Sequence, residues 1–292
     1  MIILLSLVFG IGCYIFGALY PNLWLSVWEI ISKITPTSTQ TVSNRSYGYV
    51  PGLADQRDYM FSPVVSASSI PASVDLRDKC PPVMDQGQLG SCTAHGSTGA
   101  ARYDLISTGK PDFPMSRLQV YYDTRALEGT VRSDSGGQIK DAIKVLGKNG
   151  ASHETLWPYV ISRFAKKPNA KVYADAKQYE ALSYSSVAVD PIALKQALAS
   201  GKPVVVGFTV YESFESATVA QTGIVPMPAK NEKVLGGHCV YLVGYGQKPG
   251  YFTARNSWGT GWGDKGDFYI PEGYIGSSTY GGDYWVINLF GK

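Results

Sequence analysis

The spacing of apolar and polar residues changes along the chain and predicts helices first and strands afterwards. Helical patterns, several with glycine near an end, cover residues 91–106, 115–127, 138–146 and 191–199. Apolar runs of the kind that form buried strands cover residues 203–210, 238–244, 251–255, 266–270 and 284–289. Because the two kinds of element are not interleaved, the pattern favours an α+β fold over an alternating α/β fold.

The N-terminal apolar run differs from the rest of the chain. Residues 2–20 carry no charged side chain and, as a helix, would nearly span a bilayer core. Trp24 and Trp28 follow, and tryptophan is enriched at membrane interfaces. We therefore predict a signal anchor with an interfacial segment over residues 1–34, which would make this a single-pass membrane protein. The alternatives are a buried core helix and a cleaved signal peptide, the latter leading to a secreted or lysosome-like location.

Residues 35–69 separate this run from the remaining chain. Their first part, residues 35–46, is rich in Ser, Thr, Gln and Asn and predicts a polar linker. Their second part, residues 47–69, holds proline, glycine and a small cluster of Asp and Arg residues, which suits an ordered arm or a removable segment. Residues 70–292 have the pattern of a folded domain.

Composition and charge exclude several classes of function. The chain is 45% hydrophobic and 17% charged, as is ordinary for a folded protein. Its net charge of +3 is small and its basic residues are not clustered, which argues against a nucleic-acid partner. No pair of cysteines has metal-ligand spacing, so we predict no metal site and no cofactor. A disulfide between Cys80 and Cys239 stays open, because the sequence does not give their separation.

Cys92 is the first candidate for chemistry because it lies at the predicted start of a helix, directly after Gly90-Ser91. Unpaired N–H groups and the helix dipole at that end favour a thiolate, so we expect a lowered thiol pKa. Gly87 and Gly90 allow tight turns in front of the helix. A lone cysteine at a helix start is more often a small buried residue, so this feature needs partners.

Two further motifs supply those partners. His238 follows two glycines at the predicted start of a strand, where its ring stays approachable. Asn256 begins a segment rich in Gly and Trp, and its side-chain oxygen could accept a hydrogen bond from one imidazole nitrogen. That bond would turn the other nitrogen towards the thiol, while Trp258 shields it from water. Together these residues form a Cys–His–Asn arrangement for nucleophilic catalysis.

These residues resemble the papain and cathepsin family of cysteine proteases. Residues 256–263 read Asn-Ser-Trp-Gly-Thr-Gly-Trp-Gly and are similar to the asparagine motif of that family. Residues 90–92 match its nucleophile motif, and Gln86 matches its oxyanion-hole glutamine. The separation of Cys92 and His238 also lies in the family's usual range.

The resemblance extends from about residue 70 to the C-terminus. Residues 71–77 resemble the start of the mature enzyme, and Gly136 and Gly137 resemble paired glycines whose backbone binds substrate as an added strand. The implied fold is papain-like: a helical half over about residues 75–185, a β-barrel-like half over about 186–285, and the site in the cleft between them. The residues that the resemblance places at substrate are Gly136, Gly137, Cys239, Trp258 and Trp262.

The implied activity is hydrolysis of peptide bonds in polypeptide substrates. Cys92, His238 and Asn256 would form the triad, and Gln86 would bind the oxyanion. The chain would be made as a membrane-anchored precursor in which residues 47–69 restrain activity until they are cut near residues 64–70. No paired-histidine insert of the cathepsin B kind is seen between Gly109 and Gly136, so the resemblance favours an endopeptidase.

The sequence also departs from the family pattern. Leu89 stands where the family has one half of a disulfide, so that bridge is expected to be absent. Thr93 replaces the aromatic residue that usually follows the nucleophile. The Ser-Cys-Thr sequence resembles a divergent branch with microbial and viral members. The segment before residue 70 is too short for the family's long helical pro-region.

Other polar residues are weaker candidates. His95 is about one helical turn after Cys92 and is expected to point into the first half of the domain, while His153 is expected in a solvated turn. A metal site of Cys92, His238 and Cys239 is disfavoured by the spacing. Two other classes of function remain as alternatives: a catalytically impaired scaffold on the same fold, which Thr93 keeps open, and a transferase that uses the same triad.

Overall fold

A computed structural model describes residues 46–53 and 55–290 of the chain. The predicted anchor, residues 2–20, lies outside the described residues, as does most of the predicted linker. Among the residues that are described, none of the helices has the length and apolar character that crossing a bilayer requires.

Seven strands of the described chain form one antiparallel sheet in the order β2-β7-β3-β4-β5-β6, with β1 paired to β4. The long central strands are explained by the runs of Val, Phe and Tyr that the sequence places there, since β-branched and aromatic side chains fit a pleated, buried surface. The strands are β1 (Val74–Asp75), β2 (Ala181–Val187), β3 (Val204–Tyr211), β4 (Val234–Tyr245), β5 (Tyr251–Arg255), β6 (Asp267–Pro271) and β7 (Gly281–Phe290).

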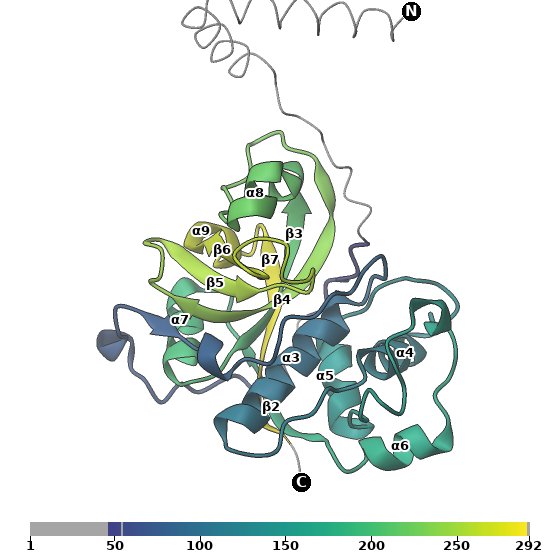
Figure 1. Ribbon diagram of the computed structural model, residues 1–292. Coiled ribbons are helices and arrows are strands. Elements are labelled where there is room, and N and C mark those ends of the chain that lie inside the picture. Colours follow the sequence, from purple (N-terminus) through teal and green to yellow (C-terminus); the bar gives the residue numbers. More distant parts are fainter. Residues whose placement is uncertain (1–45, 54, 291–292) are drawn as a thin grey trace, which may run out of the picture. The chain divides into compact units, whose positions relative to one another are not determined.

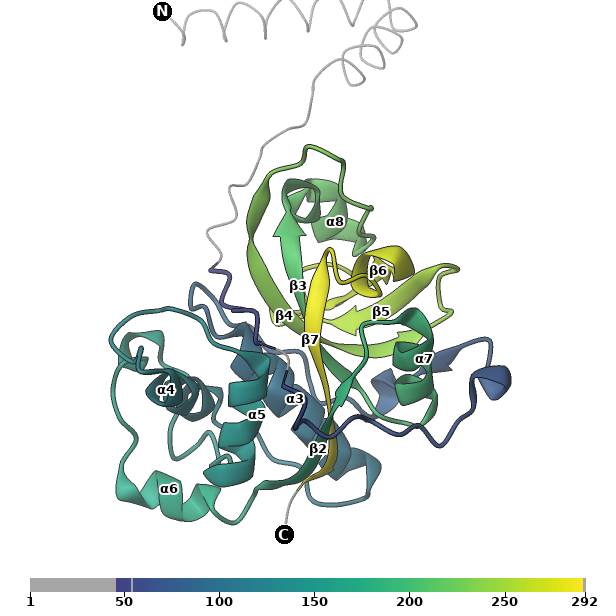
Figure 2. The ribbon, with the colours of Figure 1, turned by 180° about the vertical axis from the view of Figure 1, so that it is seen from behind.

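Helices α3 to α6 gather on one side of this sheet, and both views of the ribbon show them apart from α7 and α8 (Figures 1 and 2). Local sequence explains several helix ends, because Ser116, Asn169 and Asp190 each cap a helix by accepting from a backbone N–H of its first turn. The helices are α3 (Cys92–Ser107), α4 (Arg117–Glu128), α5 (Ile139–Lys148), α6 (Ala170–Ala176), α7 (Pro191–Ala199), α8 (Ala217–Thr222) and α9 (Glu272–Ile275).

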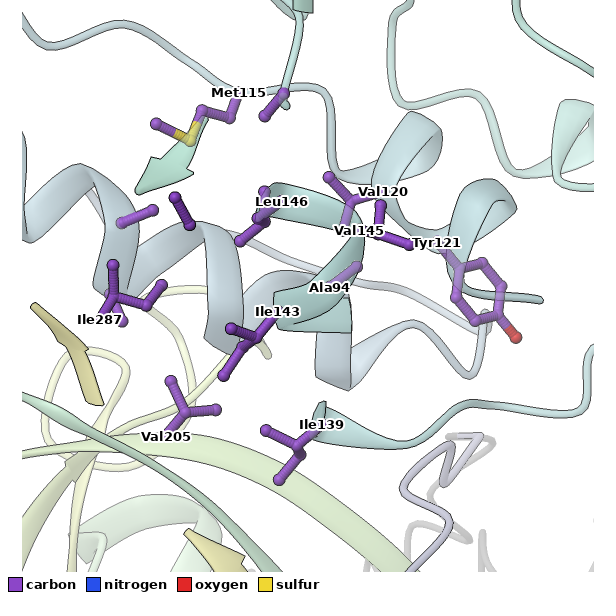
Figure 3. Packing of buried hydrophobic residues seen from close by; sticks show 14 of the residues in the cluster. Ala94, Met115, Val120, Tyr121, Ile139, Ile143, Val145, Leu146, Val205 and Ile287 are labelled. Carbon is purple, nitrogen blue, oxygen red and sulfur yellow. The ribbon is translucent and has the colours of Figure 1, made fainter. Parts of the chain in front are cut away.

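Two hydrophobic clusters fill the two halves of the domain. One lies between α3, α4 and α5 and reaches the sheet at Val205 and Ile287 (Figure 3). The other is enclosed by the sheet together with α7 and α9 and is rich in aromatic side chains. Helices on one side and a single antiparallel sheet confirm the α+β class predicted from the sequence.

Some sequence predictions were wrong in detail. β4 begins at Val234, so His238 lies inside a long strand opposite Phe208 rather than at a strand start. The two glycines before His238 weakened the apolar pattern there, but pairing with β3 extends the strand through them. The helix predicted to end at residue 146 continues to Lys148, because Gly147 is tolerated within it.

Candidate active site

Cys92 is the first residue of α3 and is completely buried. Burial raises the pKa of its thiol to about 11, while backbone N–H groups, including those of Cys239 and Gly48, act in the opposite direction. The expected lowering of the thiol pKa is therefore wrong for this structure, because loss of hydration outweighs the N–H groups around the sulfur. The interaction with Cys239 places the thiol beside the strand that carries His238.

His238 and Asn256 are joined as the sequence pattern predicted. His238 Nε2 lies 2.8 Å from Asn256 Oδ1, which also accepts from the Ser257 N–H at 2.8 Å. Trp258 stacks on the His238 ring with centroids 4.8 Å apart, and Trp262 packs edge-on against Trp258. β4 and β5 are neighbours in the sheet, so a residue that follows β5 can reach a side chain on β4. The indole covers the His–Asn hydrogen bond.

Gln86 connects the loop before the nucleophile to the loop after Asn256. Its backbone N–H donates to the Ser257 carbonyl at 2.9 Å, and its Oε1 accepts from Ser257 Oγ at 2.6 Å. Its amide Nε2 donates to the carbonyls of Ser46 and Leu89 at 3.2 and 3.0 Å. The amide is thus oriented by its oxygen and offers its N–H groups to carbonyls that come near Cys92.

The residues 46–50, which we call the cleft segment, lie between the two halves of the domain. Gly137 donates its N–H to the Gly48 carbonyl at 2.8 Å and accepts from the Val50 N–H at 3.1 Å. On the other side, the Tyr49 N–H donates to the Gly237 carbonyl at 2.9 Å. Gly137 therefore forms backbone hydrogen bonds with the cleft segment, which is the kind of pairing that the resemblance implied for substrate.

Gly136 has a different task from Gly137. Its N–H donates to the Tyr121 hydroxyl at 3.1 Å and so does not pair with the cleft segment. A Cβ on Gly136 would lie 2.1 Å from the Gly48 carbonyl oxygen, and a Cβ on Gly48 would lie 1.7 Å from that of Gly90. Glycine is needed at positions 48 and 136 because the backbone segments around Gly48, Gly90 and Gly136 lie too close together to leave room for a Cβ atom.

Tyr49 fills a pocket in the β-rich half. Its side chain is buried, its hydroxyl donates to the Gly282 carbonyl at 3.3 Å, and burial together with the nearby Asp283 raises its pKa. A Cβ on Gly207 would lie 2.2 Å from the Tyr49 ring, so the pocket exists because residue 207 is glycine. Cys239, also predicted to lie at substrate, is buried close enough to Tyr49 to raise its pKa further.

Tyr47 covers the other side of the site. Its ring lies edge-on to His238 and Trp258, with centroid distances of 6.1 and 6.3 Å, and its hydroxyl donates to the Glu215 carboxylate. With Ser46 at Gln86, Tyr47 at His238 and Gly48 at Cys92, the cleft segment contacts three of the four residues predicted to carry the chemistry. Sequence reasoning missed both tyrosines; the only signal was the Tyr-Gly-Tyr sequence at the start of the predicted arm.

Several other sequence predictions are corrected here. Cys80, Cys92 and Cys239 are all free thiols, so the open possibility of a Cys80–Cys239 disulfide is wrong. His153 does not lie in a solvated turn, because its Nδ1 lies 2.9 Å from Asp175 and its ring stacks on Phe113.

His95 points into the first half, as expected, where its ring contacts Arg117 and the Ser91 carbonyl. Burial lowers its pKa to about 3, so its ring is neutral at ordinary pH. Within residues 46–53 and 55–290, no three His, Cys, Asp or Glu side chains are grouped as metal ligands.

Known proteins similar to this chain belong to the family whose motifs were identified in the sequence. The profile described as papain family cysteine protease matches residues 70–281. An uncharacterised peptidase C1-like protein of Acanthamoeba polyphaga mimivirus is 34% identical over 85% of this chain and 88% of its own length. Cathepsin B of Dictyostelium discoideum is 31% identical over 67% of this chain and 66% of its own length. The crystal structure of xylellain, a cysteine protease from Xylella fastidiosa, has a TM-score of 0.78 and 40% identity, covering 84% of this chain and 96% of that one.

Proposed function

This chain belongs to the papain family of cysteine proteases, and we propose that it is an endopeptidase held as an inactive precursor by its own cleft segment. In the proposed reaction, His238 takes the thiol proton and Cys92 sulfur attacks a peptide carbonyl carbon. Asn256 holds Nε2 of the ring and thereby orients it, and the thiol proton is exchanged at Nδ1.

The remaining steps follow from the same groups. The oxyanion is stabilised by the Gln86 amide N–H and the Cys92 backbone N–H. His238 returns the proton to the leaving amine as the C–N bond breaks, and a thioester on Cys92 remains. Water, deprotonated by His238, attacks the thioester carbon and releases the acid and the thiol. The peptide chain to be cut would lie along Gly137, where the cleft segment now lies.

The observation that carries the proposal is the convergence of Gln86, Cys92 and the His238–Asn256 pair on one stretch of bound backbone. The test is covalent labelling with a thiol-directed epoxide peptide under reducing conditions, on a chain that begins at Ile70. We expect one label, on Cys92, and hydrolysis of a fluorogenic peptide. A folded protein that neither takes the label nor cuts peptides would favour the scaffold alternative, while trapping by added amines in place of hydrolysis would favour a transferase.

We further propose that residues 47–69 are a pro-segment. The support is that this segment contacts the rest of the domain at several points outside the candidate active site. Lys140 pairs with Asp55 and Asp58 at 3.3 and 2.6 Å, and the Phe61 N–H donates to the Ser186 carbonyl on the outer strand β2 at 2.7 Å. Gly48 presents its N–H to the thiol, while its carbonyl is turned to Gly137. The segment is therefore bound without offering that carbonyl for attack, so it blocks the site rather than serving as its substrate.

The membrane anchor over residues 1–34 and the linker that follows remain part of this proposal. Their motivation is the uncharged apolar run of residues 2–20. After expression of the full chain, the protein is expected in the membrane pellet after alkaline carbonate extraction. Release into the supernatant, together with a mature N-terminus after residue 20, would instead support a cleaved signal peptide and a secreted or lysosome-like location.

The Tyr49 pocket predicts a preference for aromatic residues. Burying an aromatic ring stabilises binding by about 1.5–3 kcal/mol, which corresponds to about 10- to 100-fold in affinity. In a peptide library cut by the chain from Ile70 onwards, one position is expected to be enriched in Tyr and Phe. Gly207→Ala should shift that position to small residues, since a Cβ there occupies the ring's place. An unchanged preference in Gly207→Ala would show that substrate does not use this pocket.

The raised thiol pKa predicts a pH profile for alkylation of Cys92. With the cleft segment in place, reaction with iodoacetamide should follow the pKa of about 11; after its removal, the apparent pKa should fall. A raised pKa means that the closed form favours the protonated thiol. This contribution to closure is complete below the ordinary thiol pKa near 9 and is lost as the pH rises towards 11. Mass spectrometry separates Cys92 from Cys80, and equal profiles in both forms would contradict the prediction.

A further inference from the structure

Asp134 lies between the loop that carries the nucleophile and the loop that carries Gly137. The Gly90 N–H donates to both oxygens of its carboxylate, at 3.0 Å each. Gly90 is two residues before Cys92, and Asp134 is three residues before Gly137. One carboxylate therefore joins the two backbone segments on which the proposed chemistry and the proposed substrate strand depend.

Tyr121 continues this connection into the helical half. It lies on α4, is fully buried, and stands among the side chains of the first hydrophobic cluster (Figure 3). Its hydroxyl donates to Asp134 and accepts from the Gly136 N–H at 3.1 Å. The two loops are thus linked by an unbroken series of hydrogen bonds, from the Gly90 N–H through Asp134 and Tyr121 to the Gly136 N–H.

Arg125, one turn further along α4, also binds the loop that carries Asp134. Its side chain is fully buried and its guanidinium carbon lies 3.9 Å from the centre of the Tyr121 ring. The guanidinium donates to three main-chain carbonyls, at 2.9, 3.0 and 2.5 Å: those of Val131, Ser133 and Phe164. Burying an arginine costs free energy unless its N–H donors are hydrogen-bonded, so the folded state favours the loop conformation that supplies these carbonyls.

Comparison with the family pattern suggests what this hydrogen-bonded link replaces. Leu89 stands where one half of a disulfide is expected in the family, and the described cysteines Cys80, Cys92 and Cys239 are free. We propose that Asp134 is a positioning residue. Its carboxylate accepts hydrogen bonds from the Gly90 N–H and the Tyr121 hydroxyl, and so fixes the nucleophile loop relative to the loop that carries Gly137. It does this in place of a covalent bridge. The proposal rests on the peptidase function proposed above.

The link also assigns separate tasks to the paired glycines. Because Tyr121 takes the Gly136 N–H, only Gly137 offers its N–H and carbonyl to a bound strand. Loss of the carboxylate would leave the Gly90 N–H and the Tyr121 hydroxyl without this acceptor and would loosen both loops. The His238–Asn256 pair is outside the link and Cys92 stays fixed at the start of α3, so the loss should weaken substrate binding at Gly137 more than the chemical step. A link without sulfur–sulfur bonds is also insensitive to reductants.

Two readouts test this proposal in the full chain. Kinetics use Tyr49→Ala as the parent, in which the cleft segment is expected to be released, and add Asp134→Ala, Asp134→Asn or Asp141→Ala. Asp141 is the matched control, since its carboxylate pairs with Lys144 on α5. For Asp134→Ala we expect a KM about tenfold higher, the effect of about 1.4 kcal/mol, with a much smaller change in kcat. Asp134→Asn keeps one acceptor oxygen for Gly90 and should fall between, while Asp141→Ala should match the parent.

Hydrogen–deuterium exchange is the second readout and does not depend on peptidase activity. In the otherwise unchanged chain, Asp134→Ala should speed exchange about tenfold in residues 87–92 and 130–137. Adding a phosphine reductant to the unsubstituted protein should leave exchange there unaltered. Unchanged exchange in Asp134→Ala, or faster exchange on reduction alone, would overturn the proposal. If the Tyr49→Ala parent cuts no peptide, that result counts against the peptidase function, and hydrogen–deuterium exchange still decides the role of Asp134. If Asp134→Ala does not fold, the exchange of Asp134→Asn is measured and interpreted in the same way.

Discussion

Replacing Cys92 with alanine is expected to remove peptide hydrolysis, lowering kcat/KM by at least about 10⁴-fold. The reason is that the other two thiols in the described part of the chain are engaged elsewhere: the Cys80 thiol bonds to the Leu76 carbonyl, and the Cys239 sulfur lies against Gly96 on α3. The measurement is turnover of a fluorogenic peptide by the chain that begins at Ile70, with a thiol-directed epoxide to count active sites.

Cys80→Ala is the matched control for this prediction. Cys80 is also a free thiol, partly buried, so its replacement removes the same group without touching the candidate site. It should keep peptide turnover and epoxide labelling. If Cys92→Ala retained activity that Cys80→Ala lost, the nucleophile assignment would be wrong. If both variants kept full activity, the reaction would not depend on either thiol.

Tyr49→Ala in the full chain is expected to raise peptidase activity by about 10²–10³-fold. Deleting a buried aromatic side chain typically costs about 3–5 kcal/mol, and here that loss falls on the closed state alone, since Tyr49 fills its pocket only while the cleft segment is bound. The closed form then loses most of its advantage over the open form. Hydrolysis of a fluorogenic peptide before any processing of the chain measures the effect.

Tyr59→Ala is the control on the same arm. Tyr59 is 83% exposed, so its side chain contributes little to docking and its loss should leave the activity low. A chain that begins at Ile70 gives the upper limit of activity. Equal activity of the full chain, Tyr49→Ala and this shortened chain would contradict a restraining role for residues 47–69.

Most of the candidate site could be predicted from the sequence because its residues lie in short local motifs. Gln86 and Cys92 share one loop and helix start, and Asn256 and Trp258 share one loop after a strand. Local backbone geometry and residue chemistry make such motifs specific, so their order and spacing were enough to pair them. His238 was also found, although the extent of its strand was not, because strand length depends on pairing with β3.

The features that escaped prediction all depend on contacts between distant segments. Tyr47 and Tyr49 gain their positions from Glu215 and from the pocket at Gly207, far along the chain. Likewise, the acceptor for the Gly90 N–H is a carboxylate more than forty positions away, as the separation of 44 residues shows. No periodicity or motif encodes such pairs, because they form only when the two halves have folded against each other.

The sequence by itself determined the family, the α+β class and the four residues of the candidate chemistry, because each rests on short-range pattern and residue type. Only the tertiary structure decided three further points: that the cleft segment lies over the candidate site, that the Cys92 thiol is buried beneath it with a raised pKa, and that Asp134 and Tyr121 join the loops on which the site depends. Burial and long-range hydrogen bonding set all three, and both are properties of the folded chain rather than of any local stretch of it.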